Sequence, residues 1–149
     1  MAGTLHLTRG LPASGKTTRA REWVADKGGL FRLNRDDFRV MMFGGWTGLA
    51  AHEDAVTVAQ HAAVSALLAA GYDVVCDDTN LAAVAMEAWS QLVAEAGAEL
   101  VVWDMTDVPL DVCLDRNEGR AGTAAYVRPT VIRYMADRYL GDATEAHCG

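Results

Sequence analysis

Eight residues near the N-terminus, Gly10 to Thr17, read GLPASGKT and fit the pattern G-x-x-x-x-G-K-[ST]. Glycines in this pattern let backbone N–H groups turn inward around phosphate oxygens, and the following helix presents its positive dipole end to them. Lys16 would reach the β- and γ-phosphates, and the Thr17 hydroxyl would bind Mg²⁺. An ordinary glycine-rich turn is the alternative, but it would match this pattern only by chance. We therefore predict a nucleoside triphosphate site, contacted by Gly10, Ala13, Ser14, Gly15, Lys16, Thr17 and Thr18.

Two pairs of arginines recur at a spacing of four residues, in LNRDDFR and in RNEGR. Arg35 and Arg39, or Arg116 and Arg120, would repel each other on one face of a helix unless an anion lies between them. Solvated surface arginines are the alternative for the second pair. In P-loop phosphotransferases such a pair belongs to a lid that neutralises charge on the transferring phosphate. We predict that role for Arg116 and Arg120, in a lid over residues 116–128.

Three carboxylates follow strand-like segments. Asp36 stands beside the first arginine pair, and the apolar run YDVVCDDTN ends in Asp77 and Asp78. Asp78 resembles a Walker-B acid, which would hold the metal ion through water. The alternative is that Asp77 or Thr79 caps the next helix. For Asp36 the alternative is that it, or Asp37, caps its own helix and pairs with Arg39 at i, i+3.

The elements that must position these residues alternate along the chain. Apolar alternation and turn signals predict strands over residues 4–9, 30–34, 72–77 and 99–105. Helical patterns are predicted over residues 15–26, 35–43, 51–70, 81–96, 108–117 and 129–140, with Gly28 and Gly29 ending the first of them. This order predicts an α/β fold: a small parallel sheet of about four strands, flanked by helices and connected by right-handed crossovers. The carboxyl ends of its strands would bring Asp36, Asp78 and the phosphate loop into one crevice.

Charge is distributed unevenly over this single domain of 149 residues, whose net charge is −7. Residues 40–115 carry no Lys or Arg against twelve acids, residues 1–39 carry eight bases, and residues 116–138 carry five arginines. The two basic blocks could form a basic cleft if the fold brings them together, or they could lie on exposed helices.

The N-terminus MAGTLHLTRG lacks the features of a signal peptide and no run is long enough to span a membrane, so we expect a cytoplasmic protein. Cys76, Cys113 and Cys148 are expected to be reduced thiols, and residues 141–149 a frayed tail.

Several of these stretches, in this order, resemble the kinase domain of the bacteriophage polynucleotide kinase-phosphatases, a family that phosphorylates 5′-hydroxyl ends of DNA or RNA. The matching stretches are GLPASGKTT, LNRDDFR, CDDTNL, DVPLDVCLDRN with nearby Arg120, and VRPTVIRYM. Together they span about residues 4–140. The resemblance implies a P-loop kinase that takes the γ-phosphate from ATP or another nucleoside triphosphate, with Mg²⁺ or Mn²⁺, and transfers it to a nucleic-acid 5′-hydroxyl. It also implies a cytoplasmic location, of the host cell if a phage encodes the chain.

Roles carried over by this resemblance are specific to positions. Lys16 and Thr17 would contact the donor phosphates and metal, Asp36 would be the general base, and Arg39 would bind the phosphate next to the reacting end of the acceptor. The remaining roles would be metal support by Asp78, acceptor contacts by Thr79 and Val127, and lid contacts by Arg116 and Arg120. The chain ends without room for the family's phosphatase domain, so we expect no 3′-end repair by this polypeptide.

Two other functions compete with this hypothesis. A small-molecule kinase of the same architecture would phosphorylate a sugar, nucleoside or drug hydroxyl without needing an acceptor phosphate. A nucleotide-dependent switch would bind the triphosphate but transfer little of it. No segment of the sequence indicates a protein partner.

Overall fold

Four parallel strands and six helices make up the part of the chain that the computed structural model describes, residues 1–26 and 30–141. The strands are β1 (Thr4–Arg9), β2 (Leu30–Arg32), β3 (Asp73–Cys76) and β4 (Glu99–Asp104), in the sheet order β2-β3-β1-β4. The helices are α1 (Lys16–Asp26), α2 (Arg35–Phe43), α3 (Ala50–Ala69), α4 (Ala83–Ala96), α5 (Leu110–Glu118) and α6 (Pro129–Tyr139). All three strand pairings are parallel. The predicted α/β architecture is therefore confirmed.

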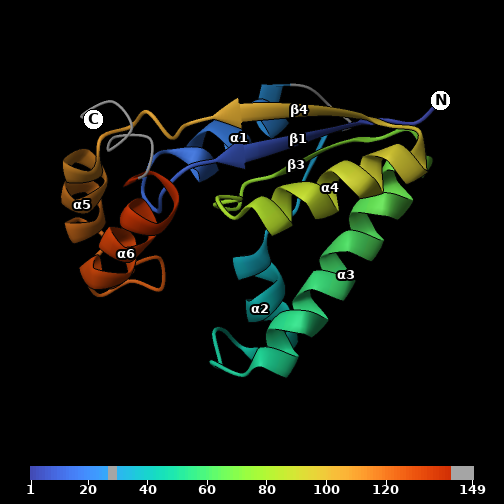
Figure 1. Cartoon of the computed structure of the whole chain (residues 1–149). Coiled ribbons are helices and arrows are strands. Elements are labelled where there is room, and N and C mark those ends of the chain that lie inside the picture. The colour runs from blue at the N-terminus through green and yellow to red at the C-terminus, as the bar shows by residue number, and fades with distance from the viewer. Residues whose placement is uncertain (27–29, 142–149) are drawn as a thin grey trace.

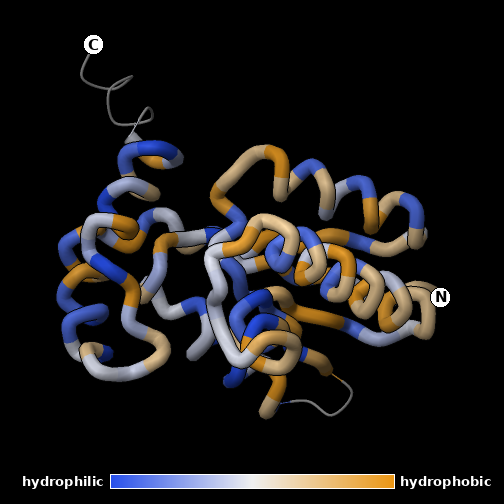
Figure 2. The backbone as a smooth tube through the Cα atoms, turned by 90° about the horizontal axis from the view of Figure 1, so that it is seen from below, coloured by the Kyte–Doolittle hydropathy of each residue, from blue (hydrophilic) through white to orange (hydrophobic). Residues whose placement is uncertain are grey.

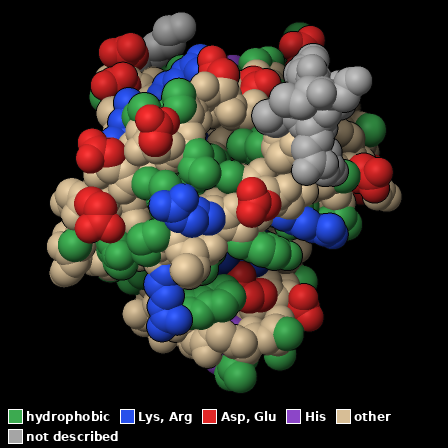
Figure 3. Space-filling model, turned by 60° about the vertical axis from the view of Figure 1, so that its left-hand side comes forward, with side chains coloured by type: hydrophobic (Ala, Val, Ile, Leu, Met, Phe, Trp, Pro, Cys, Tyr) green, Lys and Arg blue, Asp and Glu red, His purple; other side chains and the backbone are tan. Residues whose placement is uncertain are grey.

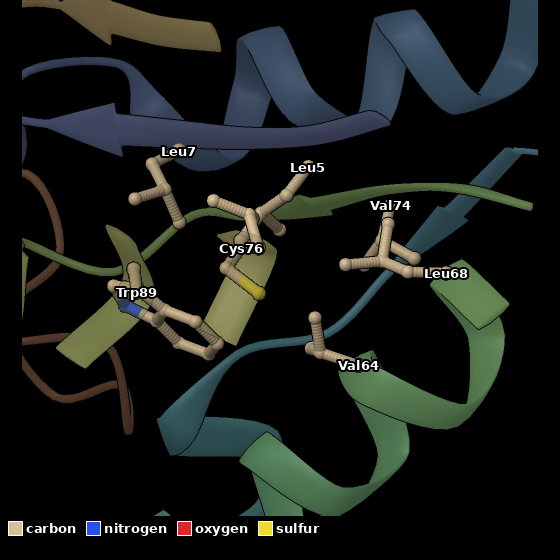
Figure 4. Packing of buried hydrophobic residues seen from close by; sticks show 8 residues of the cluster. Leu5, Leu7, Val64, Leu68, Val74, Cys76 and Trp89 are labelled. Carbon is tan, nitrogen blue, oxygen red and sulfur yellow. The ribbon is translucent and has the colours of Figure 1, made fainter. Parts of the chain in front are cut away.

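Helices cover both faces of this sheet (Figure 1). On the face covered by α3 and α4, Leu5 and Leu7 of β1 pack with Val64 and Leu68 of α3 and Trp89 of α4 (Figure 4). The other face carries Val75 and Trp103, which pack with Ala20 of α1. Apolar residues therefore project from both faces, as a parallel sheet buried between helices requires. Along the helices, hydrophobic residues alternate with hydrophilic ones in the amphipathic manner (Figure 2).

A third apolar cluster joins α5 and α6 to the carboxyl end of the sheet. Leu11, which follows β1, and Leu81, which follows β3, pack with Cys113 of α5 and Ala136 of α6. The two helices thus lie beyond the strand tips (Figure 1). Burial raises the pKa of the Cys113 thiol and that of Cys76, and both are free cysteines.

Three predicted boundaries differ from the structure by two residues, each beside a local feature of the backbone, and several others differ by one. The strand predicted to reach Asn34 ends at Arg32, since Asn34 is the N-cap of α2 and its side chain accepts the N–H of Asp37 at 2.8 Å. The helix predicted from Leu81 begins at Ala83, because Asn80 adopts a left-handed φ of 46°. The helix predicted from Val108 begins at Leu110, after Pro109. Gly28, Gly29, Cys148 and the tail from residue 142 lie outside the described residues.

Candidate active site at the carboxyl ends of the strands

The phosphate loop lies between β1 and α1, where its sequence pattern requires it. Ala13 and Gly15 have left-handed φ angles of 65° and 99°, which turn the loop back on itself before α1 begins at Lys16. A Cβ on Gly10 would lie 2.8 Å from Ser14 Oγ and 3.0 Å from the carbonyl oxygen of Met105, so this position has no room for a side chain. The loop therefore has the shape that directs backbone N–H groups toward an anion.

Lys16 is buried within this loop. Its ammonium group donates hydrogen bonds to the carbonyl oxygen of Leu11 and to Ser14 Oγ. Burial lowers the pKa of Lys16 to about 8, against the opposing effect of Asp77 and Asp78. An anion bound in the loop would offset that desolvation and favour the charged form of the side chain.

Asp77 and Asp78, adjacent at the end of β3, point to different parts of the site. Asp77 Oδ2 accepts the Thr17 hydroxyl at 2.8 Å, whereas Asp78 accepts the backbone N–H of Arg35 at 2.8 Å and the side-chain amide of Gln60 at 2.7 Å. Burial raises the pKa of Asp78 to about 6. The carboxylate beside the predicted metal-binding hydroxyl is thus Asp77, and not Asp78 as the sequence suggested.

The surroundings of Asp77 fit a magnesium site. Asp77 Oδ1 is buried and has no hydrogen-bond partner among the described residues, while Oδ2 accepts from Arg32 Nε at 3.0 Å as well as from Thr17. Such an unpaired oxygen beside a hydroxyl suits Mg²⁺, which takes one or two protein oxygens and completes its shell with phosphates and water. The described residues contain no cluster of three or more His, Cys, Asp or Glu side chains that could form an all-protein metal cage.

Asp36 and Arg39 lie on α2, at the mouth of the cavity. Arg39 Nη1 donates to Asp36 Oδ1 at 2.6 Å, and the Asp36 side chain is 86 % exposed. The i, i+3 ion pair weighed as an alternative from the sequence is therefore present. The capping part of that alternative is wrong, because Asn34 caps the helix.

An anion does lie between Arg35 and Arg39, and it is the carboxylate of Glu53 on α3. Glu53 accepts from Arg39 Nε at 2.8 Å and Nη2 at 2.7 Å, and from Arg35 Nη2 at 3.1 Å. The hydrogen bond from Arg39, then that from Arg35, lowers the pKa of Glu53. The spacing of the two arginines predicted a shared anion, but the sequence did not reveal that the protein supplies it.

The lid arginines have a different environment. Arg116 Nη1 approaches the carbonyl oxygen of Ala13 at 3.4 Å, and both Arg116 and Arg120 line a hollow beside Ser14 and Thr18. Within the described ranges, neither guanidinium forms an ion pair. The segment between them and α6 is held in place by Asn117, whose side chain bonds both the N–H and the C=O of Val127.

These parts surround one cavity of about 280 Å³. Its lining includes every class of predicted site residue: Gly15, Lys16, Thr17, Asp36, Arg39, Asp78, Thr79, Arg120 and Val127, together with Asp77 and Arg35. Arginines from both basic blocks thus meet as expected, but acids stand among them. On the face in Figure 3, Lys and Arg side chains are interspersed with hydrophobic and acidic ones, so the surface is not a continuous basic track.

Residues 5–140 match the AAA_33 family, described as an AAA domain. The chain belongs to this P-loop family. Two solved structures of the Pnkp1/Rnl/Hen1 complex, one described as an RNA repair complex, are also similar: the first aligns with a TM-score of 0.84 and 26 % identity over 97 % of this chain and 46 % of its own. The second aligns with a TM-score of 0.71 and 30 % identity over 77 % of this chain and 39 % of its own. The chain therefore spans less than half the length of either relative.

Other similar structures of this P-loop fold include a small-molecule kinase and a nucleotide-bound protein. Mycobacterium tuberculosis APS kinase CysC, in complex with AMPPNP and APS, aligns with a TM-score of 0.65 and 20 % identity over 80 % of this chain and 73 % of its own. Chaetomium thermophilum Kti12, in complex with ADP-AlF3, aligns with a TM-score of 0.69 and 22 % identity over 91 % of this chain and 79 % of its own. These likenesses show the fold of the AAA_33 chain.

Three polar residues of the AAA_33 site were missed by sequence reasoning. Glu53, Gln60 and Arg32 contact Arg39, Asp78 and Asp77 respectively. None stands in a motif, and the only signal was the unexplained arginine pair, which indicated a shared anion.

No helix in the described part of the chain is both long and apolar enough to cross a membrane.

Proposed function

We propose that this chain is a polynucleotide kinase that transfers the γ-phosphate of ATP, or of another nucleoside triphosphate, to the 5′-hydroxyl end of a DNA or RNA strand. The observation that carries the proposal is that Asp36 and Arg39 line the same cavity as Lys16 and Thr17 of the phosphate loop. Donor and acceptor groups would therefore meet within one space. Similarity to chains of an RNA repair complex supports a nucleic-acid acceptor.

The donor would lie along the phosphate loop. Its backbone N–H groups and Lys16 would bind the β- and γ-phosphates, and Arg120 and Arg116 would approach from the lid to stabilise charge on the transferring phosphate. Thr17 and Asp77 would hold Mg²⁺, with Asp78 behind them, and the ion would supply neutralisation of the phosphate oxygens. Asp77 here takes the position that the sequence assigned to Asp78.

The acceptor would enter from the side of α2. Asp36 would accept a hydrogen bond from the attacking 5′-hydroxyl while keeping its bond with Arg39, because a carboxylate can accept several hydrogen bonds. Arg39 has five N–H donors, of which Glu53 and Asp36 occupy three, so two remain for a phosphate of the acceptor strand. Thr79 and Val127 would form the wall beside the terminal nucleotide. Orientation dominates here, because the loose transition state of phosphoryl transfer needs little early proton removal.

Transfer of labelled γ-phosphate from ATP and Mg²⁺ tests the proposal. The acceptors are a 5′-hydroxyl oligonucleotide, the same oligonucleotide already 5′-phosphorylated, a nucleoside 3′-monophosphate and a bare nucleoside. We expect label on the first and third only, and loss of at least about 100-fold in kcat in Asp36→Ala, with Asp37→Ala as the matched control on the same helix. Full turnover in a folded Asp36→Ala variant would contradict the assigned base.

A small-molecule kinase remains the second candidate, because structures such as APS kinase share the fold. That function predicts label on the bare nucleoside, or on a metabolite hydroxyl, in preference to the oligonucleotide. Tight nucleotide binding without transfer to any acceptor would instead indicate a nucleotide-dependent switch.

A further inference from the structure

An exposed tryptophan stands beside the proposed acceptor site. Trp46 lies in the loop between α2 and α3 and is 68 % exposed. The Arg39 guanidinium carbon lies 5.3 Å from the centroid of its ring, within the range of a cation–π contact. A single exposed apolar side chain is common on protein surfaces, but a large aromatic ring that lies against an arginine of the cavity is a candidate binding surface.

The loop that carries Trp46 is anchored at both ends. Gly44 has a left-handed φ of 83° and ends α2, with its N–H bonded to the carbonyl oxygen of Val40 at 3.0 Å. On the other side, Thr47 Oγ1 and His52 Nδ1 are 2.9 Å apart, and the His52 ring stacks on Phe43 with centroids 4.0 Å apart. The ring is therefore presented by a structured loop.

Arg39 connects this ring to the cavity. It lines the cavity with Asp36 and at the same time lies against Trp46, so the aromatic surface begins where the cavity ends. The phosphate assigned to Arg39 joins the first nucleotide of an acceptor strand to the second. A second base bound on this side would leave the cavity next to the Trp46 ring.

Three ligands could cover such a ring: a nucleobase, a second copy of this chain, or an apolar segment of another protein. The neighbouring Met41 and Leu49 are also exposed, but the side chain that lies over the ring is Arg39, a cavity residue paired with Asp36 and Glu53. An aromatic ring next to a phosphate-binding arginine is the arrangement by which proteins hold single-stranded nucleic acid without reading its sequence. The surroundings favour the nucleobase.

We propose that Trp46 is a stacking platform for the nucleobase that follows the terminal nucleotide of a single-stranded acceptor. This inference rests on the proposed function, since it assigns a subsite to the acceptor of that reaction. It predicts that the enzyme distinguishes an acceptor with a second base from one that ends at the first phosphate.

Steady-state kinetics with two acceptors test the platform. Trp46→Ala should raise KM for a 5′-hydroxyl oligonucleotide about tenfold and leave KM for a nucleoside 3′-monophosphate unchanged, while Trp46→Phe should restore most of the loss. Met41→Ala is the matched control, because it removes an exposed apolar side chain from the same surface without removing a ring. Equal effects of Trp46→Ala on both acceptors, or none on either, would overturn the platform and leave the kinase activity standing.

Binding without catalysis separates this inference from the proposed function. A single-stranded oligonucleotide should quench tryptophan fluorescence in the wild type but not in Trp46→Phe, because Trp89 and Trp103 are buried and the half-buried Trp23 packs against His6 and Trp103. Quenching at Trp46 without any phosphate transfer would overturn the proposed function and support the platform. A dimer that forms in the wild type and is lost in Trp46→Ala would show instead that a second copy covers the ring, and would overturn the platform.

Discussion

The two arginine pairs have the same spacing in sequence and opposite electrostatic environments in the fold. Arg35 and Arg39 share the carboxylate of Glu53, and Arg39 also binds Asp36. Arg116 and Arg120, beside the phosphate loop, have no ion-pair partner among residues 1–26 and 30–141. One pair is thus compensated by the protein, whereas the other retains its full charge for a ligand.

The adjacent carboxylates Asp77 and Asp78 repeat this division. Asp77 faces the donor side through Thr17 and keeps one oxygen unpaired, while Asp78 is bonded to Arg35 and Gln60 on the acceptor side. Charge that is already satisfied maintains geometry, and charge that is left over binds a ligand. This rule predicts that substitution of the uncompensated Arg120 or Asp77 affects turnover or metal binding, and that substitution of Glu53, which compensates the acceptor-side arginines, affects stability.

The largest effect is expected at Arg120. Arg120→Ala should lower kcat by about 1,000-fold, because an arginine at the transferring phosphate stabilises charge that develops only in the transition state. The free energy of unfolding should change by less than about 0.5 kcal/mol, since no described ion pair is lost. Arg138→Ala, an exposed arginine on α6, is the control. Unchanged turnover in Arg120→Ala would show that the uncompensated charge of Arg120 does not contribute to phosphate transfer.

The next effect separates the two carboxylates. Asp77→Asn should raise the half-saturating Mg²⁺ concentration at least about tenfold, whereas Asp78→Asn should leave it nearly unchanged. Arg32→Gln is the matched control, because it removes the ion partner of Asp77 and keeps the carboxylate. The measurement is a Mg²⁺ titration of activity, paired with Mg²⁺-dependent nucleotide binding by calorimetry. A larger metal defect in Asp78→Asn would restore the assignment made from the sequence.

Substitution of Glu53 tests how much the acceptor-side ion pairs contribute to stability. Glu53→Ala should lower the free energy of unfolding by about 1–3 kcal/mol, because two partly buried guanidiniums lose their shared acceptor and repel each other. Urea denaturation measures the change, and Asp54→Ala, exposed on the same helix, should be nearly neutral. A loss no larger than that of Asp54→Ala would show that this network contributes little to stability.

Sequence reasoning predicted the order of elements from periodicity and the phosphate-loop residues of the cavity from a motif, whereas the acceptor-side residues Arg39, Thr79 and Val127 came from the family resemblance. It assigned metal support to Asp78 and did not foresee that Asp77 bonds the Thr17 hydroxyl, since adjacent residues at the end of a strand point in different directions and the sequence does not state which of them faces the loop. It missed Glu53 because the acid lies on α3, 14 residues from Arg39. Long-range ion pairs depend on how helices dock, which no local pattern encodes.

The smallest effect is a pH dependence at His61 of α3, on the acceptor side. Its ring packs against Trp89 with centroids 4.2 Å apart, and burial, followed by the charge of Arg35, lowers its pKa below 6.5. The unfolded chain therefore binds a proton at His61 before the folded protein does, so the stabilisation is complete above about pH 6.5 and is lost as the pH falls through the lower folded value. Between about pH 7.5 and about pH 5.5, His61→Gln should lose less stability than the wild type.

Nuclear magnetic resonance of the His61 ring tests whether the charge of Arg35 contributes to this shift. Arg35→Gln should raise the pKa of His61, and Arg116→Gln should leave it unchanged. A His61 ring that titrates at its ordinary value in the wild type would show that neither burial nor Arg35 lowers its pKa, whereas an unchanged His61 pKa in Arg35→Gln would show that Glu53 already neutralises the charge of Arg35.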